Sequence, residues 1–180
     1  EKNISTNDVL TTYVCSNCSA YSISPFVGQE RNCNKCGSQK TLNTTNTSKG
    51  VSEEQLNEVY NLMDVYCHPF TSGGQEIPIQ EAKLTELITL VTNYSCGEDS
   101  CSPESGGLPL EWSEYREPGT QFIKASTFAD DIAKKLELVQ SMDKEERVAR
   151  EKKSRQWVID NFSVEVIGKQ LEDIIDNMPP

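Results

Sequence analysis

The sequence predicts an α/β protein in which a parallel sheet flanked by helices follows a small, cysteine-rich β module. Three observations support this fold class: helix-like and strand-like segments alternate after residue 50, two Cys-x-x-Cys pairs lie before residue 40, and the charge changes between the two parts. Residues 1–50 hold five Lys or Arg and three Asp or Glu, whereas residues 51–180 hold twelve and twenty-five. We therefore expect two domains, 1–50 and 51–180.

The net charge of −11 argues against broad nucleic-acid binding, because such binding relies on Lys and Arg along one face. The sequence has no run of about eighteen apolar residues, and its first residues lack the pattern of a signal peptide. We therefore expect a cytoplasmic protein without a membrane span.

Four cysteines form two pairs, Cys15 with Cys18 and Cys33 with Cys36, separated by fourteen residues. Two tight turns at this spacing can present four thiolates to zinc as a tetrahedron. The segment between the pairs alternates polar and apolar residues and breaks at Gly28, which predicts a short hairpin. The module resembles a zinc ribbon, and we expect structural Zn²⁺ there. Two disulfides or free thiols are the alternatives.

The other three cysteines lack this spacing. Cys67 lies in an apolar run and is predicted to be a small buried side chain. Cys96 and Cys101 lie in a segment rich in Gly and acidic residues. This pair can form a disulfide, belong to a second metal site or remain as two unlinked thiols, and we expect unlinked thiols.

A polar linker over 41–50 precedes the alternating elements. Ser52 and Gln55 form a capping-box start, which predicts a helix over 52–63. The next predicted elements are a strand over 64–70, a glycine turn, a helix over 78–87 and a buried strand over 88–93. This order favours a parallel sheet, with a ligand expected beyond the carboxyl ends of its strands.

Residues 96–119 read as a long loop, because they hold three Pro and four Gly. A strand over 120–125 is predicted to return the chain to the sheet. Helices are predicted over 128–142, 144–161 and 164–178, with Asp143 and Ser163 as caps.

The phrases DVYCHPF, PIQEAKL, ITLVTN and WVIDNFSVEVIGKQLEDII occur in this order around the glycine turn. Together they resemble the nucleotide-sugar-binding half of GT-B glycosyltransferases of the retaining family 4 type. That family has phrases of the form D-V-x-x-x-P-S, E-G-F-G-L-P-x-x-E-A and F-S-W-E-x-x-A. The resemblance covers residues 52–178 and implies a partial Rossmann-like sheet, the C-terminal part of a GT-B domain.

The resemblance implies that the backbone N–H groups of Ser72, Gly73, Gly74 and Gln75 contact the sugar and diphosphate of the donor. Glycine lets a backbone approach a ligand closely, and free amides with the helix dipole favour an anion. The alternative is that the two glycines form an ordinary turn.

In the family, the second glutamate of E-x7-E accepts hydrogen bonds from the ribose hydroxyls, and Glu81 occupies that place. The first glutamate falls on Gly73, so its carboxylate is either lost or supplied by Glu76. Phe70 stands where the family has serine.

Cations are expected near the phosphates of such a donor. Lys124, Lys83 and Arg116 are candidates, because the family's own phosphate-binding residues lie on strands with no counterpart in this chain. His68, the lone histidine, ends the strand beside the turn, where a hydrogen bond to a ligand is feasible.

We therefore expect the donor-binding region of a retaining glycosyltransferase that transfers a sugar from a nucleotide-diphosphate sugar to a glycan or protein. The resemblance implies that it is inactive without the family's acceptor-binding half, needs no metal for chemistry and has no protein nucleophile that can be named. The bare sheet edge is expected to be covered by self-association or by the ribbon. The missing N-terminal half or another chain is an expected partner. The alternative is a noncatalytic module whose ribbon binds protein or nucleic acid.

Overall fold

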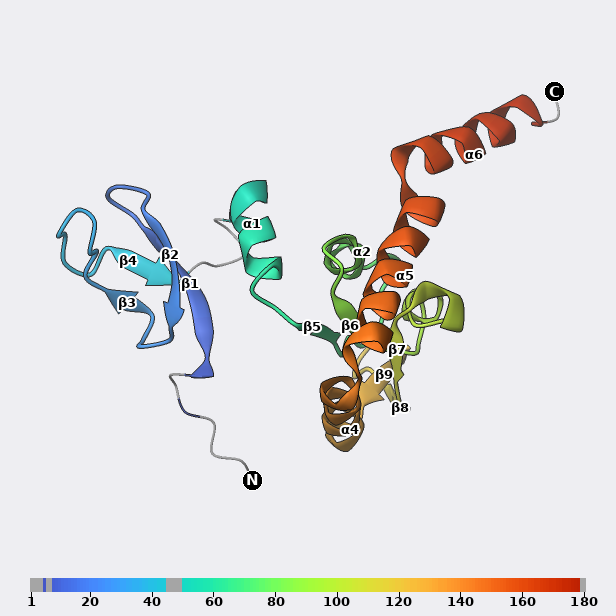
Figure 1. Ribbon diagram of the computed structural model, residues 1–180, viewed down its shortest axis with the longest axis horizontal. Coiled ribbons are helices and arrows are strands. Elements are labelled where there is room, and N and C mark those ends of the chain that lie inside the picture. Colours follow the sequence, from blue (N-terminus) through green and yellow to red (C-terminus); the bar gives the residue numbers. More distant parts are fainter. Residues whose placement is uncertain (1–4, 6–7, 45–49, 179–180) are drawn as a thin grey trace. The chain divides into compact units, whose positions relative to one another are not determined.

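The computed structural model describes residues 5, 8–44 and 50–178 (Figure 1). The chain divides into two compact units, residues 1–56 and 57–180, and the division falls inside helix α1 (Glu53–Tyr60). The sequence placed the division earlier, at the end of the linker, of which residues 45–49 lie outside the described residues.

The first unit contains a four-stranded antiparallel sheet in the order β2-β1-β4-β3. Its strands are β1 (Leu10–Cys15), β2 (Tyr21–Pro25), β3 (Glu30–Arg31) and β4 (Leu42–Thr44). The predicted hairpin between the two cysteine pairs is wrong, because β2 pairs with β1 and β3 pairs with β4. Each Cys-x-x-Cys turn instead closes one hairpin, since a tight turn favours pairing of the two strands that it joins.

The core of this unit is small. Tyr13, Cys15, Cys33 and Leu42 are buried, and the Tyr13 hydroxyl donates to the carbonyl of Gly28 at 2.8 Å. A core of this size does not stabilise a fold by itself, so cross-linking by a metal fits the module.

The second unit contains a parallel sheet in the order β5-β6-β7. The strands are β5 (Val65–His68), β6 (Ile88–Thr92) and β7 (Leu108–Leu110). Helices α2 (Ile77–Leu84), α4 (Ala129–Ser141) and α5 (Lys144–Phe162) pack against it. The prediction of a parallel sheet flanked by helices is confirmed.

The prediction of a loop over 96–119 is wrong, because this segment contains two short helices and two strands. They are α3 (Gly97–Ser100), the 3₁₀ helix η2 (Pro103–Ser105), β7 and β8 (Trp112–Arg116). Strand β7 is only three residues long and has Pro109 at its centre, which conceals it in the sequence. Proline is tolerated there because β7 is an edge strand.

The strand predicted over 120–125 is observed as β9 (Ile123–Thr127), but it does not join the parallel sheet. It pairs antiparallel with β8 and forms a separate two-stranded sheet. The backbone N–H of Ala125 donates to the carbonyl of Thr71 at 2.8 Å, which attaches β9 to the segment after β5.

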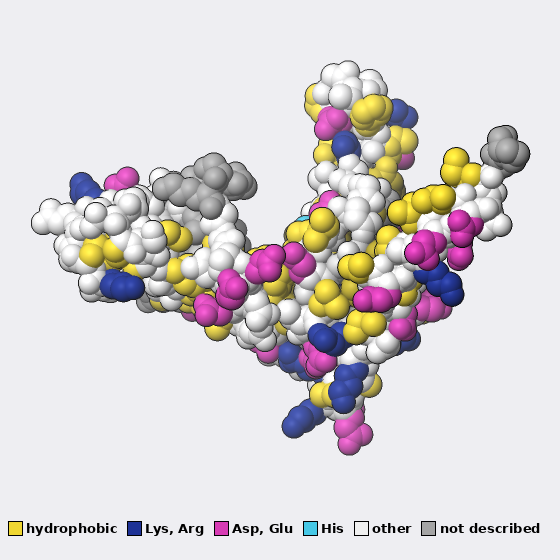
Figure 2. All heavy atoms as spheres, turned by 90° about the horizontal axis from the view of Figure 1, so that it is seen from above, with side chains coloured by type: hydrophobic (Ala, Val, Ile, Leu, Met, Phe, Trp, Pro, Cys, Tyr) yellow, Lys and Arg dark blue, Asp and Glu magenta, His cyan; other side chains and the backbone are white. Residues whose placement is uncertain are grey.

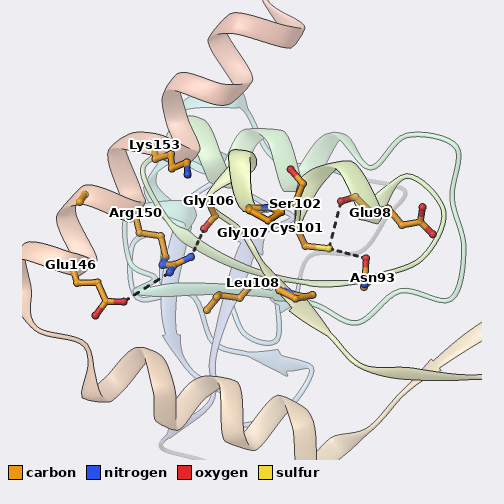
Figure 3. A pocket seen from close by; sticks show the side chains of 13 residues that line it. Asn93, Glu98, Cys101, Ser102, Gly106, Gly107, Leu108, Glu146, Arg150 and Lys153 are labelled. Carbon is orange, nitrogen blue, oxygen red and sulfur yellow. Dashed lines mark hydrogen bonds and ion pairs between the residues drawn. The ribbon is translucent and has the colours of Figure 1, made fainter.

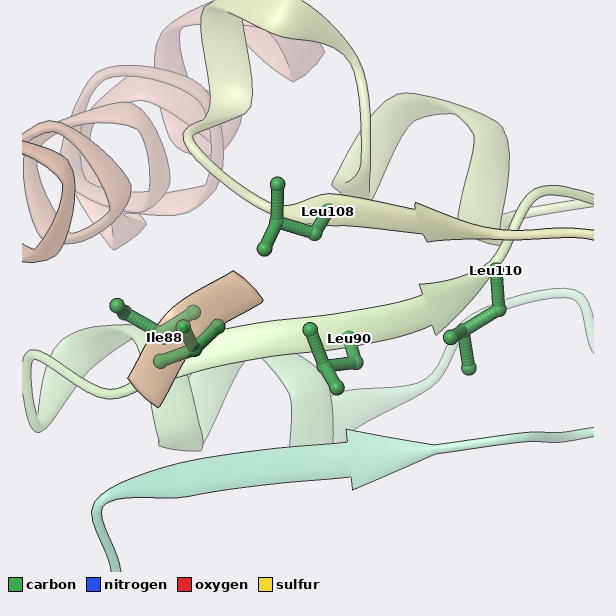
Figure 4. Close-up of a cluster of buried hydrophobic side chains, with 5 residues drawn as sticks. Ile88, Leu90, Leu108 and Leu110 are labelled. Carbon is green, nitrogen blue, oxygen red and sulfur yellow. The ribbon is translucent and has the colours of Figure 1, made fainter. Parts of the chain in front are cut away.

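Strand β6 is buried along its whole length, as its continuous apolar run predicts. Ile88 and Leu90 pack with Leu108, Leu110 and α4 residue Val139 (Figure 4). Val91, which projects from the opposite face, packs with Ile79 of α2 and with Cys101. Helices therefore cover both faces of the sheet.

The predicted helix starts are confirmed. Ser52 and Gln55 exchange side-chain and backbone hydrogen bonds at 3.0 and 3.3 Å. Asp143 caps α5 and Ser163 caps α6 (Val164–Asp176). Hydrophobic side chains are exposed along α6 (Figure 2). In the described part of the chain, no helix combines the length and apolar character needed to cross a membrane.

Candidate functional site

The first unit, which contains the predicted zinc ribbon, brings its four predicted metal ligands together. The Sγ atoms of Cys15, Cys18, Cys33 and Cys36 all lie within 4.8 Å of one another. The Sγ atoms of Cys15 and Cys36 are 3.8 Å apart, and so are those of Cys18 and Cys33. Thiolates about 2.3 Å from a tetrahedral zinc ion are separated by about 3.8 Å, whereas a disulfide bond is about 2.05 Å long. The four cysteines can therefore bind a metal ion such as zinc.

The two cysteine turns have the same backbone geometry. The N–H of Ser19 donates to the carbonyl of Cys15, and the N–H of Gly37 donates to that of Cys33, both at 2.9 Å. Ser19 has a φ of 54° and Gly37 a φ of 72°. This left-handed conformation closes each turn and directs its two thiols to one point.

Hydrogen bonds lower the pKa of two of the four thiols, Cys36 and Cys15, whereas desolvation and the neighbouring thiols raise the pKa of Cys18. The side chain and backbone of Ser38, with the amide of Asn17, lower the pKa of Cys36 to about 5. The Thr41 hydroxyl, 3.3 Å from Cys15 Sγ, lowers the pKa of that thiol. Thiolate is the form that binds metal. With four protein ligands the coordination is closed, which suits a structural ion.

The second unit places the glycine turn between the carboxyl end of β5 and the start of α2. Within the described residues, the backbone N–H groups of Gly73, Gly74 and Gln75 donate to no protein acceptor. Neither glycine has a left-handed φ. Pro78 lies in the first turn of α2, as predicted. The amides are thus available to a ligand.

Neighbouring segments hold this turn in place. The Ser95 hydroxyl, just after β6, donates to the carbonyl of Gly73 at 2.7 Å. The Lys124 ammonium, from β9, donates to Ser72 Oγ at 2.7 Å and lies 4.0 Å from Glu117. Of the three candidate cations, Lys124 is the one that lies at the turn.

The other two candidates lie elsewhere. Arg116 donates to the carbonyl of Gln121 at 3.2 Å, within the β8–β9 hairpin. Lys83 is fully buried, and its ammonium donates to the Ser105 carbonyl at 2.7 Å and the Ser154 hydroxyl at 3.0 Å. Burial lowers the pKa of Lys83 to about 7.

A cavity of about 330 Å³ adjoins the turn. It is lined by the turn and α2, by the segment after β6, and by the end of α5. Its lining residues are Gly73, Gly74, Gln75, Glu76, Gln80, Ser95, Cys96, Asp99, Ser100 and Phe162. The sequence did not mark Ser95, Asp99 or Phe162. The available signal was that Ser95 and Asp99 lie in the segment that follows the carboxyl end of β6.

The two glutamates of the predicted site have different environments. Glu76, at the N-cap of α2, lines the cavity, and its Oε2 lies 3.0 Å from His68 Nε2. Glu81 is not among the residues that line the cavity. Its Oε2 instead accepts a 2.9 Å hydrogen bond from the hydroxyl of Tyr60, whose pKa is raised by burial and by this carboxylate. The structure therefore brings Glu76 to the turn and gives Glu81 a partner within the protein.

A second, larger cavity of about 780 Å³ lies between α5 and the segment before β7 (Figure 3). Arg150 and Lys153 line it from α5, and Arg150 donates to the carbonyl of Gly106 at 3.3 Å. Glu146 is 3.9 Å from Arg150, and Glu98 also lines the cavity. Its charges are therefore mixed, and the sequence did not indicate it.

The thiols outside the ribbon are not linked. Cys67 is half-buried against the core, where burial raises its pKa. Cys96 lines the smaller cavity, whereas Cys101 is buried and has a pKa raised to about 11 by burial. Burial therefore favours the neutral thiol over the reactive thiolate at Cys67 and Cys101.

No family model matches the chain, and searches of curated proteins and of solved structures found no significantly similar protein. The function is therefore inferred from the geometry of the two sites and from the resemblance in the sequence.

Proposed function

We propose that residues 57–178 are the donor-binding region of a GT-B glycosyltransferase. The observation that carries the proposal is the turn after β5, whose free N–H groups lie at the start of α2 beside the Lys124 ammonium. Free amides, a helix N-terminus and one cation together favour a diphosphate, even in an acidic protein. The position also suits a ligand, since it lies beyond the carboxyl end of a parallel strand.

The adjoining cavity suits the sugar of such a donor. Carboxylate, amide and hydroxyl groups line most of it, and Phe162 contributes an aromatic ring. Polar groups that converge with one apolar surface are typical of sites for small polar ligands. The resemblance then supplies the reaction, which is transfer to a glycan or protein acceptor with retention. Because Glu81 is hydrogen-bonded to Tyr60, we assign it no part in ribose recognition.

We also propose that the ribbon holds one structural zinc ion. Cys15, Cys18, Cys33 and Cys36 would hold it, since their sulfur separations fit a tetrahedral site. The ion would supply a cross-link that stabilises the fold of residues 8–44.

Thermal melting with nucleotide sugars tests the donor site. UDP-glucose, UDP-galactose, GDP-mannose and ADP-glucose are the probes. A probe at one hundred times its dissociation constant raises the free energy of unfolding by about 2.7 kcal/mol. Lys124→Met should weaken the response, whereas Lys134→Met, an exposed lysine of α4, should not. No response of the unaltered protein to any probe contradicts the proposal and favours a noncatalytic binding module.

A further inference from the structure

A third cavity, of about 410 Å³, lies beyond the carboxyl ends of β6 and β7. Asn93 lines it directly after β6, and Glu111 and Trp112 line it directly after β7. Phe128, at the N-cap of α4, and Lys135 of that helix also line it. Open parallel sheets bind their ligands at the carboxyl ends of the strands. The cavity is therefore at the same edge of the sheet as the glycine turn after β5.

Two aromatic side chains of this cavity are held in place by hydrogen bonds. The Trp112 indole N–H donates to the carbonyl of Asn93 at 2.6 Å, and the Trp112 ring packs on Tyr94 with ring centres 4.6 Å apart. Phe128 is 46% exposed, and its backbone N–H donates to the carbonyl of Glu111 at 3.2 Å. Because the indole N–H is already engaged, both rings offer a ligand their apolar faces. An aromatic face carries partial negative charge and attracts C–H groups.

Polar groups of both charges line the same cavity. Within the described residues, the Glu111 carboxylate and the Lys135 ammonium make no ion pair and no side-chain hydrogen bond. One acid and one base leave the cavity without net charge, which favours a neutral ligand. The carboxylate accepts hydrogen bonds, the ammonium donates them, and the amide of Asn93 does both. A sugar ring fits this set, because it combines C–H faces with hydroxyls that donate and accept.

This cavity is separate from the cavity of about 330 Å³ beside the glycine turn, but it is close to it. The two share no lining residue. Asn93 lines one and Ser95 lines the other, and two residues of chain span at most about 7 Å. The sugar of a donor is attached to its diphosphate and stays beside the turn. A sugar in the third cavity therefore belongs to a different molecule.

We propose that the third cavity binds one neutral sugar unit of a glycan acceptor. Trp112 and Phe128 contact the C–H faces of the ring, and Glu111 accepts hydrogen bonds from its hydroxyls. The resemblance assigns acceptor binding to another half of the enzyme, so this cavity is an additional contact and favours a glycan over a protein as acceptor. The acceptor role rests on the proposed function, whereas the binding of a sugar does not.

NMR of the full chain, ¹⁵N-labelled and zinc-bound, tests the proposal through the indole N–H signals of the two tryptophans, Trp112 and Trp157. The probes are the methyl glycosides of glucose, galactose, mannose and N-acetylglucosamine, each titrated alone into the millimolar range. At least one should shift the Trp112 signal and leave unchanged the signal of Trp157, which lies on α5 outside the cavity. Uridine, guanosine and adenosine are compared, because a flat base also stacks on aromatic rings, and they should bind more weakly.

Variants at exposed positions separate the cavity from its surroundings. Phe128→Ala removes one ring and should weaken binding of the glycoside about twofold to tenfold, the strength of an aromatic contact. Phe122→Ala, at an exposed phenylalanine outside the cavity, is the matched control and should leave binding unchanged. Glu111→Gln should weaken binding about tenfold to hundredfold, because it removes a charged acceptor. Glu114→Gln, at an exposed acid of β8 outside the cavity, should not.

The outcomes distinguish this proposal from the proposed function. If no methyl glycoside shifts the Trp112 signal, if the nucleosides bind more tightly, or if Phe128→Ala and Phe122→Ala do not differ, the proposal is overturned, whether or not nucleotide sugars bind. If a glycoside binds in the cavity but no nucleotide sugar raises the melting temperature, the proposed function fails, and the acceptor role of the cavity is overturned with it.

Discussion

The buried ammonium of Lys83 should make the stability of the second unit depend on pH. This side chain is fully buried among α2, η2 and α5, and its Nζ lies 5.1 Å from the centre of the Trp157 ring. It has two hydrogen-bond acceptors, and the described residues place no carboxylate in an ion pair with it. Lys83→Met keeps an unbranched side chain, one atom shorter than that of lysine, and removes the charge.

The sign and size of the effect follow from the pKa values. Burial lowers the pKa of Lys83 from 10.5 to about 7. Between these values the unfolded chain binds more protons than the folded chain, so the free energy of unfolding rises with pH. For one group with this shift, the rise from pH 7 to pH 9 is about 2 kcal/mol. The Lys83→Met variant lacks this contribution.

Urea unfolding at pH 7 and pH 9, followed by tryptophan fluorescence, measures the effect. Trp112 and Trp157 are the only two tryptophans, so the signal reports the second unit. Each protein is compared with itself at the two pH values, which cancels the hydrogen bonds lost in the variant. Lys152→Met, at an exposed position of α5, is the control. Equal pH dependence in the unaltered protein and in Lys83→Met would refute the reasoning.

Three further predictions concern the ribbon and the hydrogen bond between Tyr60 of α1 and Glu81 of α2. The unaltered protein should bind one zinc ion per chain by atomic emission, and Cys36→Ser should lower this content, whereas full retention would contradict the four-cysteine site. Gly37→Ala should lower the melting temperature of the zinc-bound ribbon, followed by far-UV circular dichroism, because a left-handed residue other than glycine costs about 1–2 kcal/mol. Tyr60→Phe should lower the free energy of urea unfolding by about 1.5–3 kcal/mol, because it removes a hydrogen bond to the Glu81 carboxylate. Tyr115→Phe, at an exposed tyrosine, should leave this free energy unchanged. Equal effects of the two substitutions would contradict the account.

Sequence patterns predicted the elements whose signals are local. The capping box at Ser52, the caps Asp143 and Ser163, and the buried run of β6 each depend on a few neighbouring residues, and the structure confirms them. The Cys-x-x-Cys pairs also predicted their own clustering, because the spacing itself encodes two tight turns.

Strand partners could not be predicted in the same way. Alternation identified β2 as a strand but contained no information on whether it pairs with β1 or β3. Strand β7 was missed since Gly and Pro around a three-residue strand read as a loop. For β9, the partner is β8, the neighbouring strand of the same hairpin, and the sequence did not identify it because residues 112–116 read as part of a loop.

The candidate donor site shows the same division. The sequence marked the glycine turn, Glu76 and Lys124, which the structure brings to one region. The hydrogen bond between Glu81 and Tyr60 could not be predicted from the sequence, because the two residues lie on different helices. Local patterns therefore located the turn, and only the tertiary structure separated its two glutamates.

The most direct test of the proposed donor site is to record the backbone amide signals of the ¹⁵N-labelled, zinc-bound protein by NMR during titration with UDP, GDP and ADP. The account predicts that the largest shifts for at least one nucleotide fall on the amides of Gly73, Gly74 and Gln75. Shifts confined to the cavity beside Arg150, or no shifts with any of the three, would contradict it.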